Sequence, residues 1–236
     1  MSTAQRVILL VSNLCLLAAL AGLIVRRRVR LVYSFPLYLL AVVVLSTLSG
    51  LWPARFNTWS FYWFKQSIYS LLEMAIAIEL AVRVFEAFPA ARRAARGALL
   101  LVLLVTMIAV WSVPTGQVPT GRSQQQWAAL VLVLHPRIAN GTAWLFGSLF
   151  AVILYYRLPL HPLHKAVAFG FMAALLLVTF GLDQIRRTNF AALSVLSYVS
   201  SLAFTLITAY WAWAAWRRDE PPPVAQGVVD RIQPWR

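Results

Sequence analysis

Polar side chains lie at helical spacing inside one apolar stretch, FYWFKQSIYSLLEMAIAIELAVRVFE, residues 61–86. At 100° per residue, Gln66, Tyr69 and Glu73 share one face of the helix that this stretch predicts. Glu73 lies about 18 Å along the axis from Phe61 at a rise of 1.5 Å per residue, close to the middle of the helix. A charged side chain at the centre of a bilayer costs about 2.5 to 3.5 kcal/mol on insertion scales, so this carboxyl needs a structural or functional reason.

Three interpretations of Glu73 are open. It locks the fold by hydrogen-bonding polar groups on neighbouring helices, it lines an aqueous cavity that binds a ligand or ion, or it relays protons. Its own helix offers it no close partner of opposite charge, and Arg137 is the nearest candidate cation elsewhere in the chain.

The last apolar stretch carries hydroxyl side chains at spacings of three and four residues, which place them in one stripe. They are Ser194, Ser197, Ser201, Thr205 and Thr208. Small hydroxyl residues allow close packing and hydrogen bonding between helices, which is one interpretation. The other is a polar lining that faces Glu73, in which Ser197 and Ser201 are the candidate contacts.

Glu79 is a different case, because Arg83 follows it at i, i+4 on the same helix. This spacing predicts a structural ion pair near the end of the helix.

Other catalytic and metal-binding patterns are missing from the sequence. His161 and His164 have a metal-like spacing, but Pro162 interrupts it and no third ligand is near. No two histidines could face each other to hold a haem, and the last apolar stretch has no lysine for retinal. Nucleophile elbows, zinc-protease helices and phosphate loops are absent too. We therefore expect a protein that is not an enzyme and holds no metal or cofactor.

Composition indicates what kind of molecule positions these residues. Of the 236 residues 61% are hydrophobic and 12% are charged, and the net charge is +14. Because the basic residues sit in short segments between apolar runs, the charge predicts anionic lipid headgroups as partners rather than nucleic acid. The single cysteine, Cys15, excludes an internal disulfide framework.

The apolar runs predict an all-α, polytopic membrane protein: one bundle of seven transmembrane helices. The expected spans are about 7–25, 31–52, 59–85, 98–113, 137–156, 163–182 and 190–216, with a cytoplasmic tail over 217–236. Residues 127–134 read as a short interfacial helix broken at Pro136, with insertion into the membrane as the alternative. An outside N-terminus and a cytoplasmic C-terminus put fourteen of the 21 Lys and Arg residues on the cytoplasmic side. Rich Ala and Arg usage is associated with bacteria, so we expect the bacterial inner membrane.

The segments YWFKQSIYSLLEMAIAIELAVRVFEAFPAARR and LHPRIANGTAWLFGSLFAVILYYRL resemble a set of short seven-helix integral membrane proteins of acidobacterial type. Glu79, Phe85, Phe88 and Pro89 match their glutamate near the end of the third helix and the F-x-P-rich basic loop after it. The arrangement is also loosely similar to bacterial seven-helix receptor modules. The resemblance implies the seven-helix fold and transfers no site, because no activity is assigned to that set.

The functional expectation is a non-enzymatic sensor or receptor module, or an accessory subunit of a membrane complex with a partner chain or a second copy. The alternative is a small transporter or proton-coupled carrier that uses Glu73.

Overall fold

A computed structural model describes residues 3–56, 58–86, 126–155, 158, 160–177 and 193–217. Within the helices, the side chains of 3–6, 59, 85–86, 126–140 and 193–197 lie outside this description. The described residues form helices and no strand, which confirms the all-α class. The long helices are α1 (Thr3–Val25), α2 (Ser34–Leu51), α4 (Trp59–Glu86), α6 (Gln126–Tyr155), α7 (Pro162–Leu176) and α9 (Leu193–Trp216). Two short ones, η1 (Arg28–Arg30) and α3 (Pro53–Phe56), lie in the connections on either side of α2.

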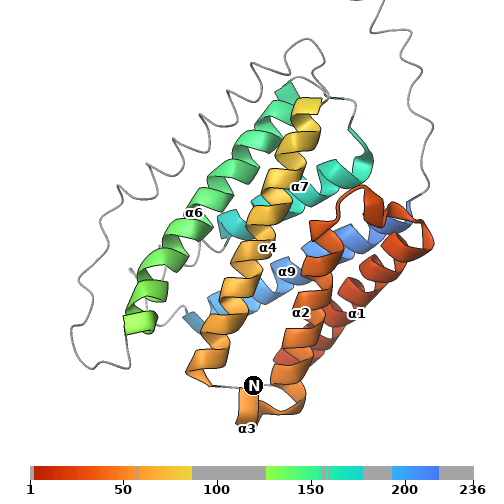
Figure 1. The fold of residues 1–236 in the computed structure, drawn as a ribbon. Helices are drawn as coiled ribbons and strands as arrows, with labels where there is room; N and C mark the ends of the chain where they lie inside the picture. Colours follow the sequence, from red (N-terminus) through yellow and green to blue (C-terminus); the bar gives the residue numbers. More distant parts are fainter. Residues whose placement is uncertain are drawn as a thin grey trace, which may run out of the picture.

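The six long helices contact one another in a closed ring, in the order α1, α2, α4, α6, α7, α9 and back to α1 (Figure 1). The helices α1, α4, α6 and α9 run toward the end of the bundle that holds η1, whereas α2 and α7 start there. Consequently α1 and α9 are parallel neighbours: Ser12 meets Thr205, and ten residues later Gly22 meets Trp216. We call the end that holds η1 the basic end, because Arg26, Arg27, Arg28 and Arg30 lie there.

Proline marks the starts of two helices at the basic end. Pro162 is the first residue of α7, where its missing N–H costs nothing, and the His161 side chain caps the helix by accepting from the Leu163 N–H at 3.1 Å. Pro36 stands in the first turn of α2, at a position that likewise needs no N–H donor. The α2 helix therefore begins at Ser34, three residues later than the sequence predicts.

An aromatic cluster fills the centre of the bundle. The Phe35 and Trp211 rings meet edge to face with centroids 5.2 Å apart, and the Phe146 and Phe171 rings stack at 5.0 Å. Trp211 is fully buried, and its indole N–H donates to the Ala166 carbonyl at 3.1 Å. Gly170 makes room for it, since a Cβ there would lie 2.6 Å from Trp211 Cε2.

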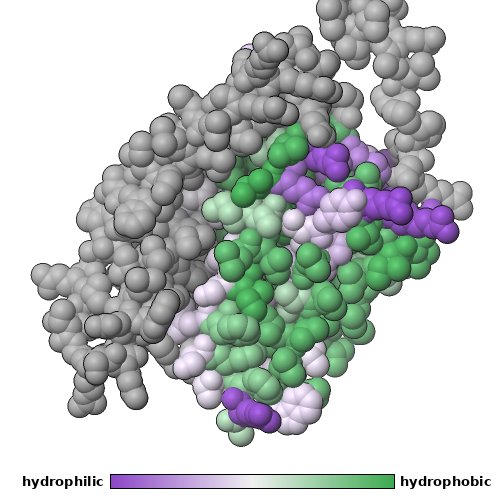
Figure 2. Space-filling view, in the orientation of Figure 1, coloured by the Kyte–Doolittle hydropathy of each residue, from purple (hydrophilic) through white to green (hydrophobic). Residues whose placement is uncertain are grey.

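The outside of the bundle is largely apolar. Figure 2 shows hydrophobic residues over most of the visible surface of the described helices, with the most hydrophilic residues at its two ends. Val7–Val25 and Ser34–Leu51 are long and apolar enough to cross a membrane, by length and composition. At 18 residues, α2 is about 27 Å long, close to the roughly 30 Å hydrocarbon core of a bilayer.

The predicted helix break at Pro136 is wrong. The structure has one continuous helix, α6, which starts at Gln126 and runs through this proline. A proline inside a helix removes one hydrogen bond and can bend the helix without ending it, especially where neighbouring helices support it. The predicted fourth span, 98–113, lies outside the described residues, as do the end of the sixth span, the start of the seventh and the tail from residue 218 onward.

Candidate functional site

Glu73 lies on the face of α4 that packs against α2. Its carboxyl lies next to the hydroxyl of Tyr38, which is buried in α2 at 5% exposure. Tyr69, one turn earlier on α4, places its ring 6.0 Å from that of Tyr38. The structure thus brings two of the predicted site residues, Tyr69 and Glu73, together with a third, Tyr38, that the sequence analysis missed. We call these three residues the Glu73 cluster.

The remaining predicted site residues divide by what the structure describes. Gln66 is half-buried on α4, seven residues or about 10 Å along the axis from Glu73. Ser201 lies in α9, where its carbonyl accepts a bond from Thr205 Oγ1 at 2.8 Å. Arg137 and Ser197 belong to α6 and α9, and their side chains lie outside the described residues.

The hydroxyl stripe of α9 faces α1 at Thr205. The Oγ atoms of Ser12 and Thr205 are 2.6 Å apart, and Ser12 is buried at 6% exposure. Because Thr205 Oγ1 donates to the Ser201 carbonyl, Ser12 is the donor in the bond between the helices. Thr208 is fully buried and donates to the Thr205 carbonyl at 2.9 Å. At these positions the stripe acts in helix packing, the first of its two interpretations.

Glu79 is engaged with the start of α2. Its Oε1 accepts from the Tyr33 N–H at 2.7 Å, and its Oε2 accepts from both the N–H and the hydroxyl of Ser34 at 2.9 Å. A carboxylate at this point satisfies backbone donors that have no partner within the helix and interacts favourably with the helix dipole. Glu79 therefore caps α2 across the bundle. The predicted ion pair with Arg83 stays a prediction.

Arg28 caps the C-terminal end of α9, as Glu79 caps the N-terminal end of α2. It is 4% exposed, and its Nη1 donates to the carbonyls of Ala214 and Ala215 at 3.1 and 3.0 Å. Its Nη2 donates to the Arg217 carbonyl at 2.6 Å. The positive guanidinium thus covers the last carbonyls of the helix, where the dipole favours a cation.

His164 links α7 to the segment between η1 and α2. Its Nε2 lies 3.1 Å from the Leu31 carbonyl, and the ring is buried at 6% exposure. Since a carbonyl only accepts, Nε2 is the donor in this bond. Among the described residues no group of three or more side chains is arranged to hold a metal ion.

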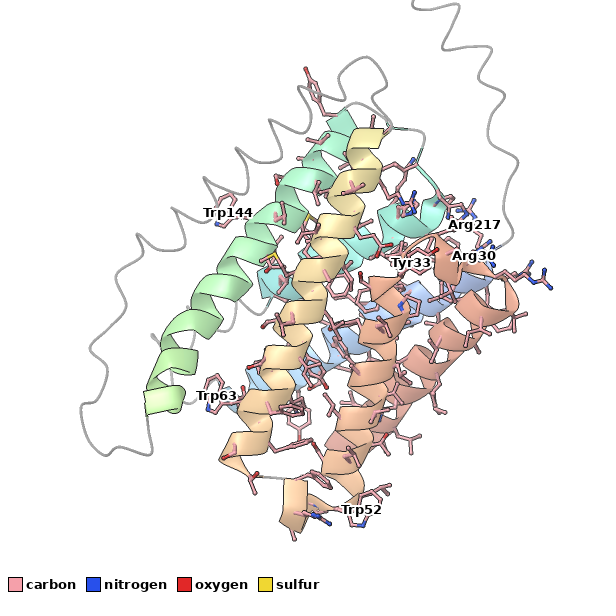
Figure 3. The ribbon with its side chains drawn as sticks, in the orientation of Figure 1. Arg30, Tyr33, Trp52, Trp63, Trp144 and Arg217 are labelled. Carbon is pink, nitrogen blue, oxygen red and sulfur yellow. The ribbon has the colours of Figure 1, made fainter. Side chains whose placement is uncertain are left out.

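Charge is distributed unequally between the two ends of the bundle. Figure 3 places Arg30, Tyr33 and Arg217 together at the basic end and Trp52 at the opposite end. The described basic residues at the basic end are Arg26, Arg27, Arg28, Arg30, Arg83, Lys165 and Arg217, whereas Arg55 and Lys65 lie toward the other end.

No protein-family model, curated protein or solved structure matches the chain.

Proposed function

We propose that the chain is a multi-pass membrane protein of seven spans with its C-terminus in the cytoplasm. The apolar exterior and the two candidate spans support a place in the membrane. Exposed aromatic side chains at the two ends, Trp52 at one and Tyr33, Trp213 and Trp216 at the other, have the positions of the aromatic belts of membrane proteins. With the basic end on the cytoplasmic side, the charges follow the positive-inside rule, as in a bacterial inner membrane.

The helix directions support an odd number of spans. Because α1 and α9 run in the same direction, a chain that crosses a bilayer with both makes an odd number of crossings from α1 to α9 inclusive. The helices α4 and α6 also run in the same direction, which fits a third and a fifth span separated by a fourth.

The function that we favour within this framework is an accessory subunit of a membrane complex, with a sensor or receptor module as the related possibility. One observation carries it: polar side chains of the described interior make contacts between helices. Glu73 of α4 lies next to Tyr38 of α2, and Ser12 of α1 donates to Thr205 of α9. Such contacts make a stable bundle and leave recognition to its outer surfaces, where Leu71, Trp144 and Leu206 are about 70% exposed.

The Glu73 cluster also supports a second candidate, a proton-coupled carrier. An ionisable carboxyl near the middle of α4, next to two tyrosine hydroxyls, is a chain of groups that can exchange protons. This candidate needs Glu73 to change its protonation state during transport, whereas the subunit does not.

Topology is tested first, and the single cysteine makes this simple. In a Cys15→Ser background, single cysteines replace Arg30, Arg217 and Arg55, and intact cells or sealed vesicles are labelled with a membrane-impermeant maleimide. We expect the maleimide to label positions 30 and 217 only from the cytoplasmic side, and position 55 only from the outside. Labelling of all three from the same side excludes the proposed arrangement.

Proton flux then separates the two functions. Purified protein in liposomes is exposed to a pH gradient, and the internal pH is followed with a fluorescent dye for wild type and Glu73→Gln. A subunit gives equal traces for both proteins and for empty liposomes, and in native membrane extracts it migrates in a complex well above its own 26.5 kDa. Flux by the wild type that Glu73→Gln abolishes would establish the carrier instead.

A further inference from the structure

The connection between α1 and α2 contains four arginines that point in different directions. Arg28 is directed inward to the end of α9, whereas Arg26, Arg27 and Arg30 are exposed. Arg27 has a left-handed backbone conformation (φ 54°, ψ 30°), which turns the chain between the end of α1 and η1. One buried arginine thus anchors a turn that displays three others.

Three other helices hold this connection in place. Arg28 binds α9, the Leu31 carbonyl meets His164 of α7, and Glu79 of α4 binds the backbone of Tyr33 and Ser34. Because the backbone is fixed at several points, the exposed arginines lose less conformational entropy when they bind a ligand than they would on a free loop.

More positive charge and a set of aromatic side chains surround the turn. Arg217 lies with its guanidinium 5.4 Å above the ring of Trp213, and Lys165 is exposed in the first turn of α7, next to His164. The Trp216 indole is oriented by its bond to the Ala18 carbonyl at 2.9 Å. Trp213 and Trp216 are half-exposed, at 56% and 43%, as expected for side chains at the level of lipid headgroups.

From this arrangement we propose that the turn over residues 26–30 is a binding site for the phosphate groups of anionic phospholipids. The ligand groups are the guanidinium groups of Arg26, Arg27 and Arg30, and Arg28 is a positioning residue. Guanidinium groups match phosphate oxygens in geometry as well as charge. The adjoining apolar surface and tryptophans fit acyl chains attached to that phosphate, which favours a lipid over a soluble polyanion. This inference rests on the proposed membrane location and adds a lipid class and named residues to it.

The test uses the full chain in an uncharged detergent and counts bound lipid by native mass spectrometry during titration with phosphatidylglycerol or phosphatidylcholine. Wild type is expected to prefer phosphatidylglycerol. Arg26→Gln/Arg30→Gln should bind it about tenfold more weakly, and each single variant about threefold more weakly. The matched control, Arg55→Gln/Lys65→Gln, removes two positive charges from the other end and should change binding less than twofold.

Further arms of the experiment decide what the site recognises. Arg26→Lys/Arg30→Lys retains the charge and should bind between wild type and the glutamine variant. Equal losses in the two double glutamine variants, or none in either, would overturn the proposal, as would displacement of the lipid by millimolar inorganic phosphate. The single variants provide the test where the double variant does not fold. The maleimide labelling fails or succeeds independently, so an error in membrane topology is distinguishable from an error in lipid binding.

Discussion

Glu79 of α4 closes the start of α2 through Ser34, whose N–H and hydroxyl both lie 2.9 Å from the same carboxylate oxygen. The second oxygen takes the Tyr33 N–H at 2.7 Å. A cap supplied by another helix also fixes the register of α2 against α4. The contact therefore contributes both to the local stability of α2 and to the packing of the pair.

Replacing Glu79 with Gln is expected to destabilise the bundle by about 1 to 2 kcal/mol. The amide keeps one oxygen but presents an NH₂ group to backbone donors, and the interaction of the negative charge with the helix dipole is lost. Ser34→Ala removes only the hydroxyl bond and should cost about 0.5 to 1 kcal/mol. Thermal unfolding in detergent measures both.

The control for this prediction is Arg83→Gln, which removes the residue that the sequence pairs with Glu79. Glu79 and Ser34 should couple in a double-mutant cycle. If Arg83→Gln reproduces the whole effect of Glu79→Gln and the Ser34 cycle shows no coupling, the ion pair matters and the cap does not.

Arg28 is expected to be the arginine of its connection whose loss costs most stability. Arg28→Ala leaves the end of α9 without three charge-assisted bonds and should destabilise by about 2 to 4 kcal/mol. Arg28→Lys keeps the charge but cannot reach all three carbonyls, so its loss should be smaller. Arg30→Ala, on the exposed side of the same turn, should change stability by less than about 0.5 kcal/mol.

Hydrogen exchange locates the Arg28 effect. The last turn of α9 should exchange faster in Arg28→Ala, while the start of α2 keeps its protection because Glu79 still caps it. Loss of protection throughout the bundle would mean that Arg28 acts on the fold as a whole and is not a cap of one helix.

Much of the architecture follows from patterns along the chain, whereas the partners of the polar groups do not. The apolar runs predict α1 and α2, and the spacing of Gln66, Tyr69 and Glu73 places them on one face of α4. Tyr38 could not be identified in this way, because the meeting of α2 with α4 depends on the register between two helices. A shift of one turn would bring another residue opposite Glu73.

Glu79 shows the same limit. Its i, i+4 spacing to Arg83 is visible in the sequence and predicts only a local partner, whereas its observed partners lie across the bundle at the start of α2. A signal for the contact does exist: Pro36 places the first turn of an apolar helix close to Ser34, and the N–H groups there need an acceptor. Arg28 is similar: the sequence does not distinguish it from the three other arginines of its run, because its role depends on contact with the end of α9.

The Glu73 cluster yields a third prediction, which separates a structural lock from a functional carboxyl. Tyr38→Phe leaves the Glu73 carboxyl without its hydroxyl partner inside the bundle and should cost about 1 to 3 kcal/mol. Glu73→Gln keeps an oxygen that can accept from Tyr38, so it should be closer to wild type. A double-mutant cycle, measured by thermal unfolding, should show that the two changes are not additive.

Stability and transport together decide the interpretation of that cycle. A lock requires coupling between the two positions and no flux in either protein. If Glu73→Gln is more stable than wild type and Tyr38→Phe is neutral, the carboxyl imposes a cost that its contact with Tyr38 does not offset. That outcome would favour the carrier.

Glycines on two adjacent helices give the last prediction. The space beside one of them is occupied by a neighbouring side chain, and the space beside the other is open. A Cβ at Gly170 would come within 2.6 Å of Trp211 Cε2, whereas a Cβ at Gly147 would meet nothing within 4 Å. Gly170→Ala must displace a fully buried indole that is bonded to Ala166, so we expect a loss of about 2 kcal/mol or more. Gly147→Ala should instead stabilise α6 by up to about 1 kcal/mol through helix propensity alone. Because both substitutions add one methyl group to a helix, opposite signs in thermal unfolding would locate the tight contact between α7 and α9 at Trp211, and equal effects would contradict it.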